Sequence, residues 1–113
     1  MTQSRLKSEI WVQAHLRRCM TEGVYALVAR KGDVDAGAIA VKVYMGSGLA
    51  KLFVRSRDLD GEEVWRNPLT KEDEADAASP EPDIDKWLAR EASIDPDIWV
   101  IEIDDAAGRA FLD

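Results

Sequence analysis

Two aspartates separated by one residue are the first candidates for chemistry in this chain. Asp33 and Asp35 flank Val34 in a segment bounded by Gly32 and Gly37, so both carboxylates can face one side of a loop. Hard divalent cations prefer oxygen ligands, which such a loop would supply. An Asp side chain also favours turns, because it accepts a hydrogen bond from a backbone N–H group two residues later. The glycines and the aspartates therefore predict a hairpin turn between two strands, with a metal or substrate contact as the alternative.

A third carboxylate would be needed for hydrolysis. Glu102 lies in an apolar run near the end of the chain, and it could join Asp33 and Asp35 if the two segments adjoin. A split site of Asp35, Glu102 and Lys42 is also conceivable. Hydrolysis with two metal ions requires carboxylates that converge, which no linear spacing ensures. A divalent-metal-dependent hydrolase is therefore the alternative function, and whether the protein is an enzyme stays open.

His15 and Cys19 are the only residues of their types, and they stand four apart in a predicted helix. Two ligands at this spacing can share one ion. A metal site would need further soft ligands, and a nucleophilic cysteine would need a base with its own orienting group. The pair is therefore interpreted as structural, and no cofactor is expected.

The charge of the chain is uneven. Residues 1–31 hold six Lys and Arg against two acidic residues, whereas residues 32–113 hold nine against twenty, and the net charge is −7. Arg17 and Arg18, with Arg30 and Lys31, could form one basic patch if the helix lies beside the first strand. Nucleic-acid binding is not expected, because an acidic body repels phosphate.

The hydrophobic pattern predicts an α+β domain with a mostly antiparallel sheet. It contains a meander of three to four strands, a C-terminal strand, an N-terminal helix and a second helix before the last strand. The helices are Leu6–Glu22, in which Ile10–Val12 could instead open a strand, and a helix with Ile84, Trp87, Leu88 and Ala92 on one side. The strands are Val24–Lys31, Ala38–Met45, Leu49–Arg57, Glu62–Arg66 and Ile98–Ile103, and Asp104–Leu112 is predicted to add a short helical turn.

The 113 residues fit a single domain, 1–113, with a mobile acidic loop at about 70–82. One cysteine and no apolar run long enough for a bilayer indicate a cytoplasmic protein without membrane contact. Both faces of the first strand are apolar, so it is expected to be central. Lys51, Phe53 and Arg55 share a half-solvated face of the third strand. Together with Arg17 and Arg18 they are the predicted interaction surface of a non-enzymatic binding module, whose partner is a protein or a second copy of the chain.

Several motifs resemble those of an alphaproteobacterial family of small proteins that is known by a domain-of-unknown-function label. The resemblance implies a bacterial cytosolic protein of about this size and assigns no activity. The motifs are Arg5-Leu6-Lys7-Ser8-Glu9 before Trp11, Leu16-Arg17-Arg18, Gly32-Asp33 with Asp35-Ala36-Gly37, Val41-Lys42-Val43 and Asp97-Ile98-Trp99-Val100.

Overall fold

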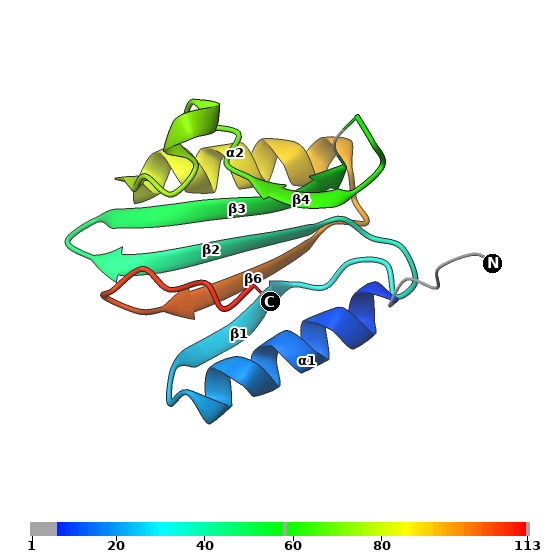
Figure 1. The fold of residues 1–113 in the computed structure, drawn as a ribbon, viewed down its shortest axis with the longest axis horizontal. Coiled ribbons are helices and arrows are strands. Elements are labelled where there is room, and N and C mark those ends of the chain that lie inside the picture. Colours follow the sequence, from blue (N-terminus) through cyan, green and yellow to red (C-terminus); the bar gives the residue numbers. More distant parts are fainter. Residues whose placement is uncertain (1–6, 58, 113) are drawn as a thin grey trace.

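The computed structural model, which describes residues 7–57 and 59–112, contains two α-helices and one six-stranded sheet (Figure 1). The helices are α1 (Ser8–Thr21) and α2 (Glu81–Ile94), and Glu72–Glu74 forms a turn of 3-10 helix. The strands are β1 (Tyr25–Arg30), β2 (Ile39–Gly46), β3 (Leu49–Arg57), β4 (Glu63–Arg66), β5 (Ser79–Pro80) and β6 (Trp99–Asp104). The predicted fold class, α+β with a mostly antiparallel sheet, is confirmed. Leu6, the expected first residue of the first helix, lies outside the described residues.

The strand order is β1-β6-β2-β3-β4, and the short β5 pairs with β3. β6 runs parallel to β2, and the other strand pairs are antiparallel. The meander therefore consists of β2, β3 and β4 alone. Because β6 lies between β1 and β2, the segment Gly32–Gly37 is not the hairpin turn that its glycines suggested. The expected central position of the first strand is also wrong, since β1 is an edge strand.

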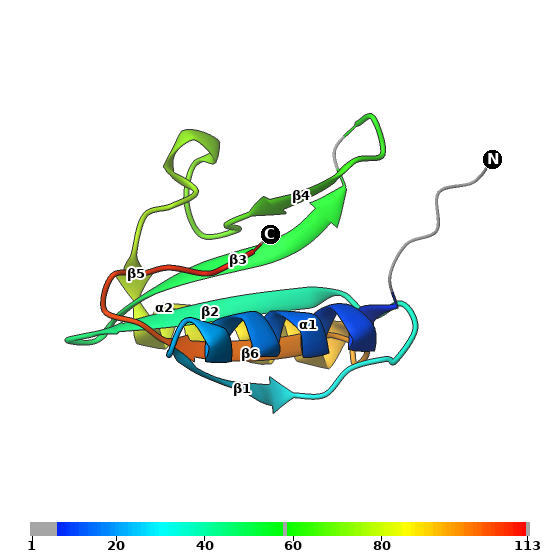
Figure 2. The ribbon, with the colours of Figure 1, turned by 60° about the horizontal axis from the view of Figure 1, so that its bottom comes forward.

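The two helices cover opposite faces of the sheet, with α1 in front and α2 behind in Figure 2. Helix α1 includes Ile10–Val12 and buries a stripe of four side chains spaced three or four residues apart: Ser8, Val12, His15 and Cys19. Beneath it lies an apolar layer that includes Ile39, Val41, Val43, Phe53, Trp99, Ile101 and Ile103. Helix α2 packs Ile84 and Leu88 on the opposite layer of Ala40, Ala50, Leu52, Ile98 and Val100.

The acidic segment before α2 contains short regular elements. The 3-10 turn Glu72–Glu74 is followed by β5, and α2 begins at Glu81, within the stretch predicted as loop. No helix in the described part of the chain is long and apolar enough to span a membrane.

The C-terminal segment, residues 105–112, crosses the α1 side of the sheet without forming the predicted helical turn. Its path is fixed by polar contacts at both ends. Asp105 accepts hydrogen bonds from the backbone and the guanidinium of Arg109, and Arg18 of α1 donates to the carbonyl of Phe111 at 2.5 Å. The segment therefore joins the end of the chain to its first helix.

Candidate functional site

The loop that carries Asp33 and Asp35 is a structural junction. One carboxylate oxygen of Asp33 accepts hydrogen bonds from the N–H groups of Asp35 and Ala36, at 3.1 and 3.0 Å, as in an Asx turn. The backbone N–H of Asp33 donates a hydrogen bond to the carbonyl oxygen of Asp97. The carbonyl oxygen of Asp33 accepts a hydrogen bond from the indole N–H of Trp99 at 2.7 Å. The expected turn chemistry of Asp33 is therefore present.

The same loop closes the N-terminus of α1. The first N–H groups of a helix have no partner inside the helix. Here the N–H of Ser8 donates to the carbonyl of Asp35, and that of Glu9 donates to Val34. The hydroxyl of Ser8 donates to Gly37 at 2.6 Å. The loop thus replaces the side-chain cap that Lys7, the residue before the helix, does not provide.

Glu102 is not brought to this loop. The loop meets the chain at Asp97, five residues before Glu102, and five residues of extended strand span roughly 16 Å. Asp35 instead lies 3.4 Å from Lys7 in an exposed ion pair. Among the described residues no three His, Cys, Asp or Glu side chains are grouped as a metal ion would require.

His15 and Cys19 do lie together, with Sγ and Nε2 3.9 Å apart, but both are buried in the core. Nε2 of His15 is 2.8 Å from the carbonyl oxygen of Ala110. A carbonyl oxygen only accepts, so Nε2 carries the proton. Burial raises the pKa of the Cys19 thiol, which disfavours a nucleophilic thiolate.

The predicted surface on β3 is largely covered. Phe53 is 9% exposed and belongs to the core under α1, so its face is not half-solvated as expected. Lys51 pairs with Asp76 at 3.1 Å, and the guanidinium of Arg55 lies 5.8 Å from the ring centre of Trp11. The side chains of Lys51, Phe53 and Arg55 lie on one face of β3, but core packing and ion pairs occupy them.

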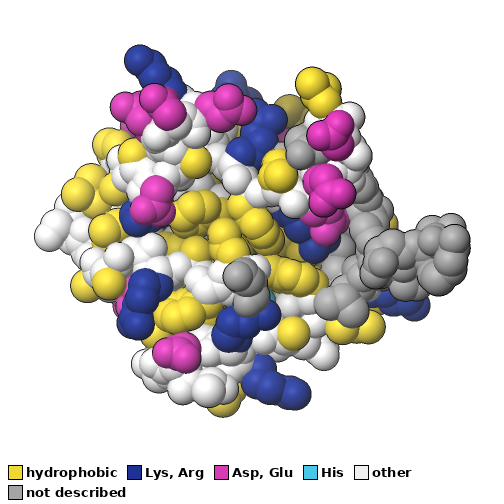
Figure 3. All heavy atoms as spheres, viewed as in Figure 1, with side chains coloured by type: hydrophobic (Ala, Val, Ile, Leu, Met, Phe, Trp, Pro, Cys, Tyr) yellow, Lys and Arg dark blue, Asp and Glu magenta, His cyan; other side chains and the backbone are white. Residues whose placement is uncertain are grey.

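The basic residues do not form one patch. Arg17 and Arg18 lie at the end of α1, whereas Lys31 lies beside Glu9 and Gln13 near its start. In Figure 3 acidic side chains lie mainly in the upper half of the face, whereas basic side chains occur in both halves.

A cluster of charges lies on the α2 side of the sheet, around a buried lysine. Lys42 of β2 has a side chain only 5% exposed, and its ammonium lies 2.6 Å from Asp85 and 2.7 Å from Glu81 in α2. Glu102 of β6 is 3.9 Å away. Burial by itself lowers the pKa of Lys42, but the hydrogen bonds to Asp85 and Glu81 outweigh it and raise the pKa overall. Lys42 is therefore a permanent cation at neutral pH.

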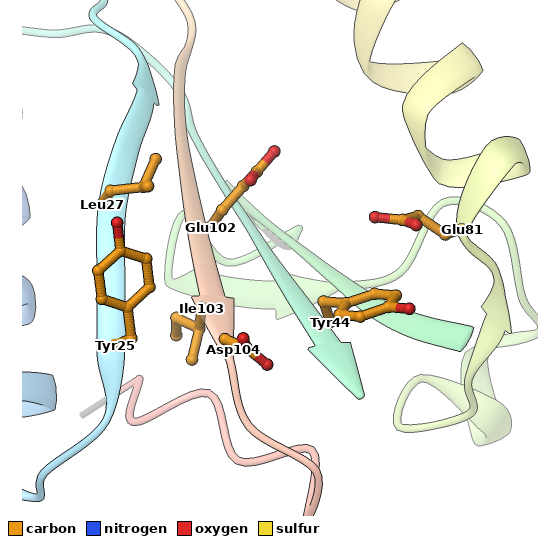
Figure 4. A pocket seen from close by; sticks show the side chains of 7 residues that line it. All are labelled: Tyr25, Leu27, Tyr44, Glu81, Glu102, Ile103 and Asp104. Carbon is orange, nitrogen blue, oxygen red and sulfur yellow. The ribbon is translucent and has the colours of Figure 1, made fainter. Parts of the chain in front are cut away.

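A pocket of about 170 Å³ opens beside this cluster. It is lined by Tyr25 and Leu27 of β1, Tyr44 of β2, Glu81 at the start of α2, and Glu102, Ile103 and Asp104 of β6. In Figure 4 the Tyr25 and Tyr44 side chains stand on either side of β6, with Asp104 between them and Glu81 facing from α2. The hydroxyl of Tyr44 accepts a hydrogen bond from Gly48 at 3.3 Å, which holds that ring in place.

Strand register explains why these side chains converge. Residues that lie opposite each other on neighbouring strands point to the same face of the sheet. Tyr25 and Tyr44 both pair with Asp104, while Leu27 and Lys42 both pair with Glu102. Helix α2 covers the layer formed by β2, β3 and the start of β6, and it leaves this corner of the sheet open.

The sequence contained part of this site. Alternation already placed Lys42 and Tyr44 on one face of their strand, and Glu102 and Asp104 have the same spacing of two. The contributions of Tyr25 and Glu81 were missed. Their convergence depends on β6 entering between β1 and β2, which no local pattern shows.

The fold and this site define a small α+β protein with a helix on each face of its sheet and an acidic pocket lined by tyrosines. The protein-family comparison matches residues 6–113 to a family described as "Protein of unknown function (DUF1491)". The chain belongs to this family, and the expected resemblance to a family of unknown function is confirmed at that level.

Solved structures of proteins similar to this chain agree with this family assignment. A crystal structure of a DUF1491 family protein from Caulobacter crescentus CB15 is 46% identical, with a TM-score of 0.82, and the match covers 96% of this chain and 95% of that one. An NMR structure of a DUF1491 family protein from the same organism is 45% identical, with a TM-score of 0.82 over 97% and 94% of the two chains. The solution structure of Atu0922 from A. tumefaciens is 31% identical, with a TM-score of 0.71 over 89% and 86%. No match was found among curated proteins.

Proposed function

We propose that this protein is a cytoplasmic, non-enzymatic binding module whose acidic pocket receives an arginine side chain of a protein partner. The observation that carries this proposal is the imbalance of charge in the pocket. Three carboxylates line the pocket: Glu81, Glu102 and Asp104. Lys42 is the cation that contacts Glu81 and Glu102, and its charge is also neutralised by Asp85. An added cation would complete the charge balance.

The chemistry of the walls favours a guanidinium over other cations. A planar guanidinium donates paired hydrogen bonds to carboxylates and stacks on aromatic rings, whereas an ammonium is a compact point charge. Tyr25 and Tyr44 offer rings on both sides of Asp104. A cation over a tyrosine ring gains roughly 0.5–1 kcal/mol at an exposed site.

The size of the pocket also selects its occupant. Its volume of about 170 Å³ is below the roughly 300–1,000 Å³ of pockets that hold drug-sized ligands and cofactors. A single side chain is therefore the natural occupant. One such contact is weak, and a partner would need further contacts around the pocket to reach micromolar affinity.

The test uses a short capped Gly-Arg-Gly peptide and its citrulline counterpart, which has nearly the same shape without the charge. Titration into ¹⁵N-labelled protein is followed by NMR. We expect the arginine peptide to shift the amide signals of Tyr25, Glu102 and Asp104 in a saturable manner, with a millimolar dissociation constant that rises with salt. The citrulline peptide should cause much smaller shifts.

Two charge-removing variants sharpen the test. Asp104→Asn should weaken binding of the arginine peptide about threefold or more, because it removes a carboxylate of the pocket. Asp73→Asn removes the same charge from the 3-10 turn, outside the pocket lining, and should leave binding unchanged. Equal shifts with both peptides, or equal affinities of both variants, would refute the proposal.

A further inference from the structure

The exposed edge strand β1 differs from the opposite edge of the sheet. Its first five residues, Tyr-Ala-Leu-Val-Ala, carry no charge. Tyr25 is 69% exposed, and Leu27 and Val28 are each 36% exposed. The opposite edge, β4, begins with Glu63 and ends with Arg66. Charged side chains are a common protection of sheet edges against pairing, and β1 lacks them over this stretch.

The surroundings of β1 leave room for another strand. In Figure 2 no other described segment lies beyond β1 at the lower margin of the sheet. The acidic pocket flanks its α2 side, and a second hollow of about 280 Å³ lies between α1 and β1, lined by residues that include Leu16 and Val28. A bulge between Val28 and Arg30 interrupts the pairing with β6, so the regular ladder is Tyr25–Val28.

We infer that β1 pairs with β1 of a second copy of this chain, antiparallel and about a twofold axis, to form one continuous sheet. A strand edge presents unpaired N–H and C=O groups that such pairing satisfies. A closed twofold contact uses the same surface on both copies. With the axis perpendicular to the sheet, both α2 helices and both acidic pockets lie on the same side.

Charge distribution favours a second copy in this orientation. Glu22 and Asp104 lie at the start of β1, the latter directly beside Tyr25, whereas Arg30 and Lys31 lie at its end. Antiparallel pairing brings the start of one β1 to the end of the other. The twofold axis therefore creates two equivalent acidic–basic contacts, while parallel pairing would place like charges together.

The dimer does not depend on a ligand in the acidic pocket, so it is tested on the purified full chain alone. Sedimentation velocity over a wide concentration range should show a monomer–dimer equilibrium. Amide exchange at Ala26 and Val28 should slow as the protein concentration rises, because the strand register points these N–H groups away from β6 and toward the second copy. A monomer at every concentration would overturn the inference.

Two lysine variants at leucines of similar exposure distinguish pairing through the β1 edge from non-specific hydrophobic association. Leu27→Lys places two like charges near the axis and should abolish the dimer. Leu49→Lys makes the same change at a residue that is 44% exposed on β3 and should leave dimerisation intact. Circular dichroism and thermal unfolding establish that each variant is folded. An unchanged dissociation constant for a folded Leu27→Lys variant would refute pairing through β1.

A charge exchange tests the orientation with exposed residues whose substitution leaves the core intact. Lys31→Glu and Glu22→Lys should each raise the dimer dissociation constant about tenfold. The double variant should recover most of this loss, because the opposite charges again face each other across the axis. Dimers of both single variants that are as strong as the wild type would contradict the antiparallel arrangement.

Discussion

His15 in α1 donates a hydrogen bond from Nε2 to the carbonyl oxygen of Ala110, over 2.8 Å, and thereby ties the first helix to the C-terminal segment. The imidazole is fully buried and stacks on Trp11, with ring centres 4.8 Å apart. Its Nδ1 atom is buried without a hydrogen-bond partner among the described residues. Burial lowers the pKa of His15, the bond to Ala110 opposes this effect, and the charge of Arg18 adds to the lowering.

The pH dependence of stability follows from this lowered pKa. The folded protein holds His15 neutral more strongly than the unfolded chain does, so protonation favours unfolding. The free energy of unfolding should therefore fall as the pH drops below about 6.5, by at most roughly 1.4 kcal/mol per pH unit. Urea unfolding across this pH range measures the effect.

The matched control is His15→Gln, because His15 is the only histidine of the chain and Gln can still donate to Ala110. Carboxylates titrate in both proteins, so the difference between the two curves isolates the imidazole. We expect the wild type to lose stability more steeply than the variant below pH 6.5 and in parallel with it above. Identical slopes throughout would contradict the assignment.

The buried ammonium of Lys42 gives a second prediction. Lys42→Met leaves Glu81, Asp85 and Glu102 close together without their cation, and we expect the free energy of unfolding to fall by roughly 1–3 kcal/mol. Lys51→Met is the control, since Lys51 pairs with an Asp76 side chain that is 81% exposed, and its loss should be below about 1 kcal/mol. Chemical denaturation at neutral pH compares them. Similar losses in both variants would contradict a special contribution of the carboxylate cluster around Lys42.

A double-mutant cycle then assigns the interaction to its partner. Lys42→Met and Asp85→Asn should be less costly together than the sum of the two single changes, because both remove the same contact. The raised pKa of Lys42 means that this stabilisation is complete at neutral pH and is lost only as the pH rises through the folded-state pKa, above the ordinary value of about 10.4.

The third prediction concerns Gly37 and rests on the lack of space for a side chain there, not on its backbone dihedral angles. A Cβ atom at Gly37 would lie 2.2 Å from the carbonyl oxygen of Asp97, which is backbone and cannot move aside freely. We expect Gly37→Ala to lower the free energy of unfolding by about 3 kcal/mol. It should also broaden the indole N–H signal of Trp99, which donates to Asp33 in the same junction.

Gly48→Ala is the comparison for Gly37. Gly48 has φ of +75° with open space around it, so its cost is conformational alone, about 1 kcal/mol. It should leave the Trp99 signal unchanged, because Gly48 lies in the turn between β2 and β3. If Gly48→Ala cost as much as Gly37→Ala, close packing of the junction would not explain the need for glycine.

Local patterns in the sequence predicted most elements of this fold but not the pocket. Alternation identified the strands and placed Lys42 beside Tyr44, since side-chain direction depends only on the strand itself. The glycines around Asp33 suggested a hairpin, yet the same residues serve a close approach to Asp97. Strand order is decided by distant contacts, and β6 pairs with β1 across more than sixty residues of chain. The pocket depends on that strand order, so it could not be predicted from local sequence patterns.

The aspartate loop gives the last prediction and a test of the hydrolase alternative. The carboxylate of Asp33 holds two backbone N–H groups, so Asp33→Ala should lower the free energy of unfolding by about 1 kcal/mol, and Asp33→Asn by less, because its amide oxygen still accepts. Asp35→Ala removes an exposed ion pair with Lys7 and should cost below about 0.5 kcal/mol.

Divalent cations should not change this ranking. Because Asp33 is engaged in its turn and Glu102 lies beside Lys42, we expect Mg²⁺, Mn²⁺, Ca²⁺ and Zn²⁺ to leave the unfolding temperature of wild type and of Asp33→Asn/Asp35→Asn equal to that of the metal-free samples. A ligand at a hundredfold excess over its dissociation constant would stabilise the fold by about 2.7 kcal/mol. A saturable rise in wild type that disappears in the double variant would therefore be plainly visible, and it would restore the metal-dependent site built on this loop.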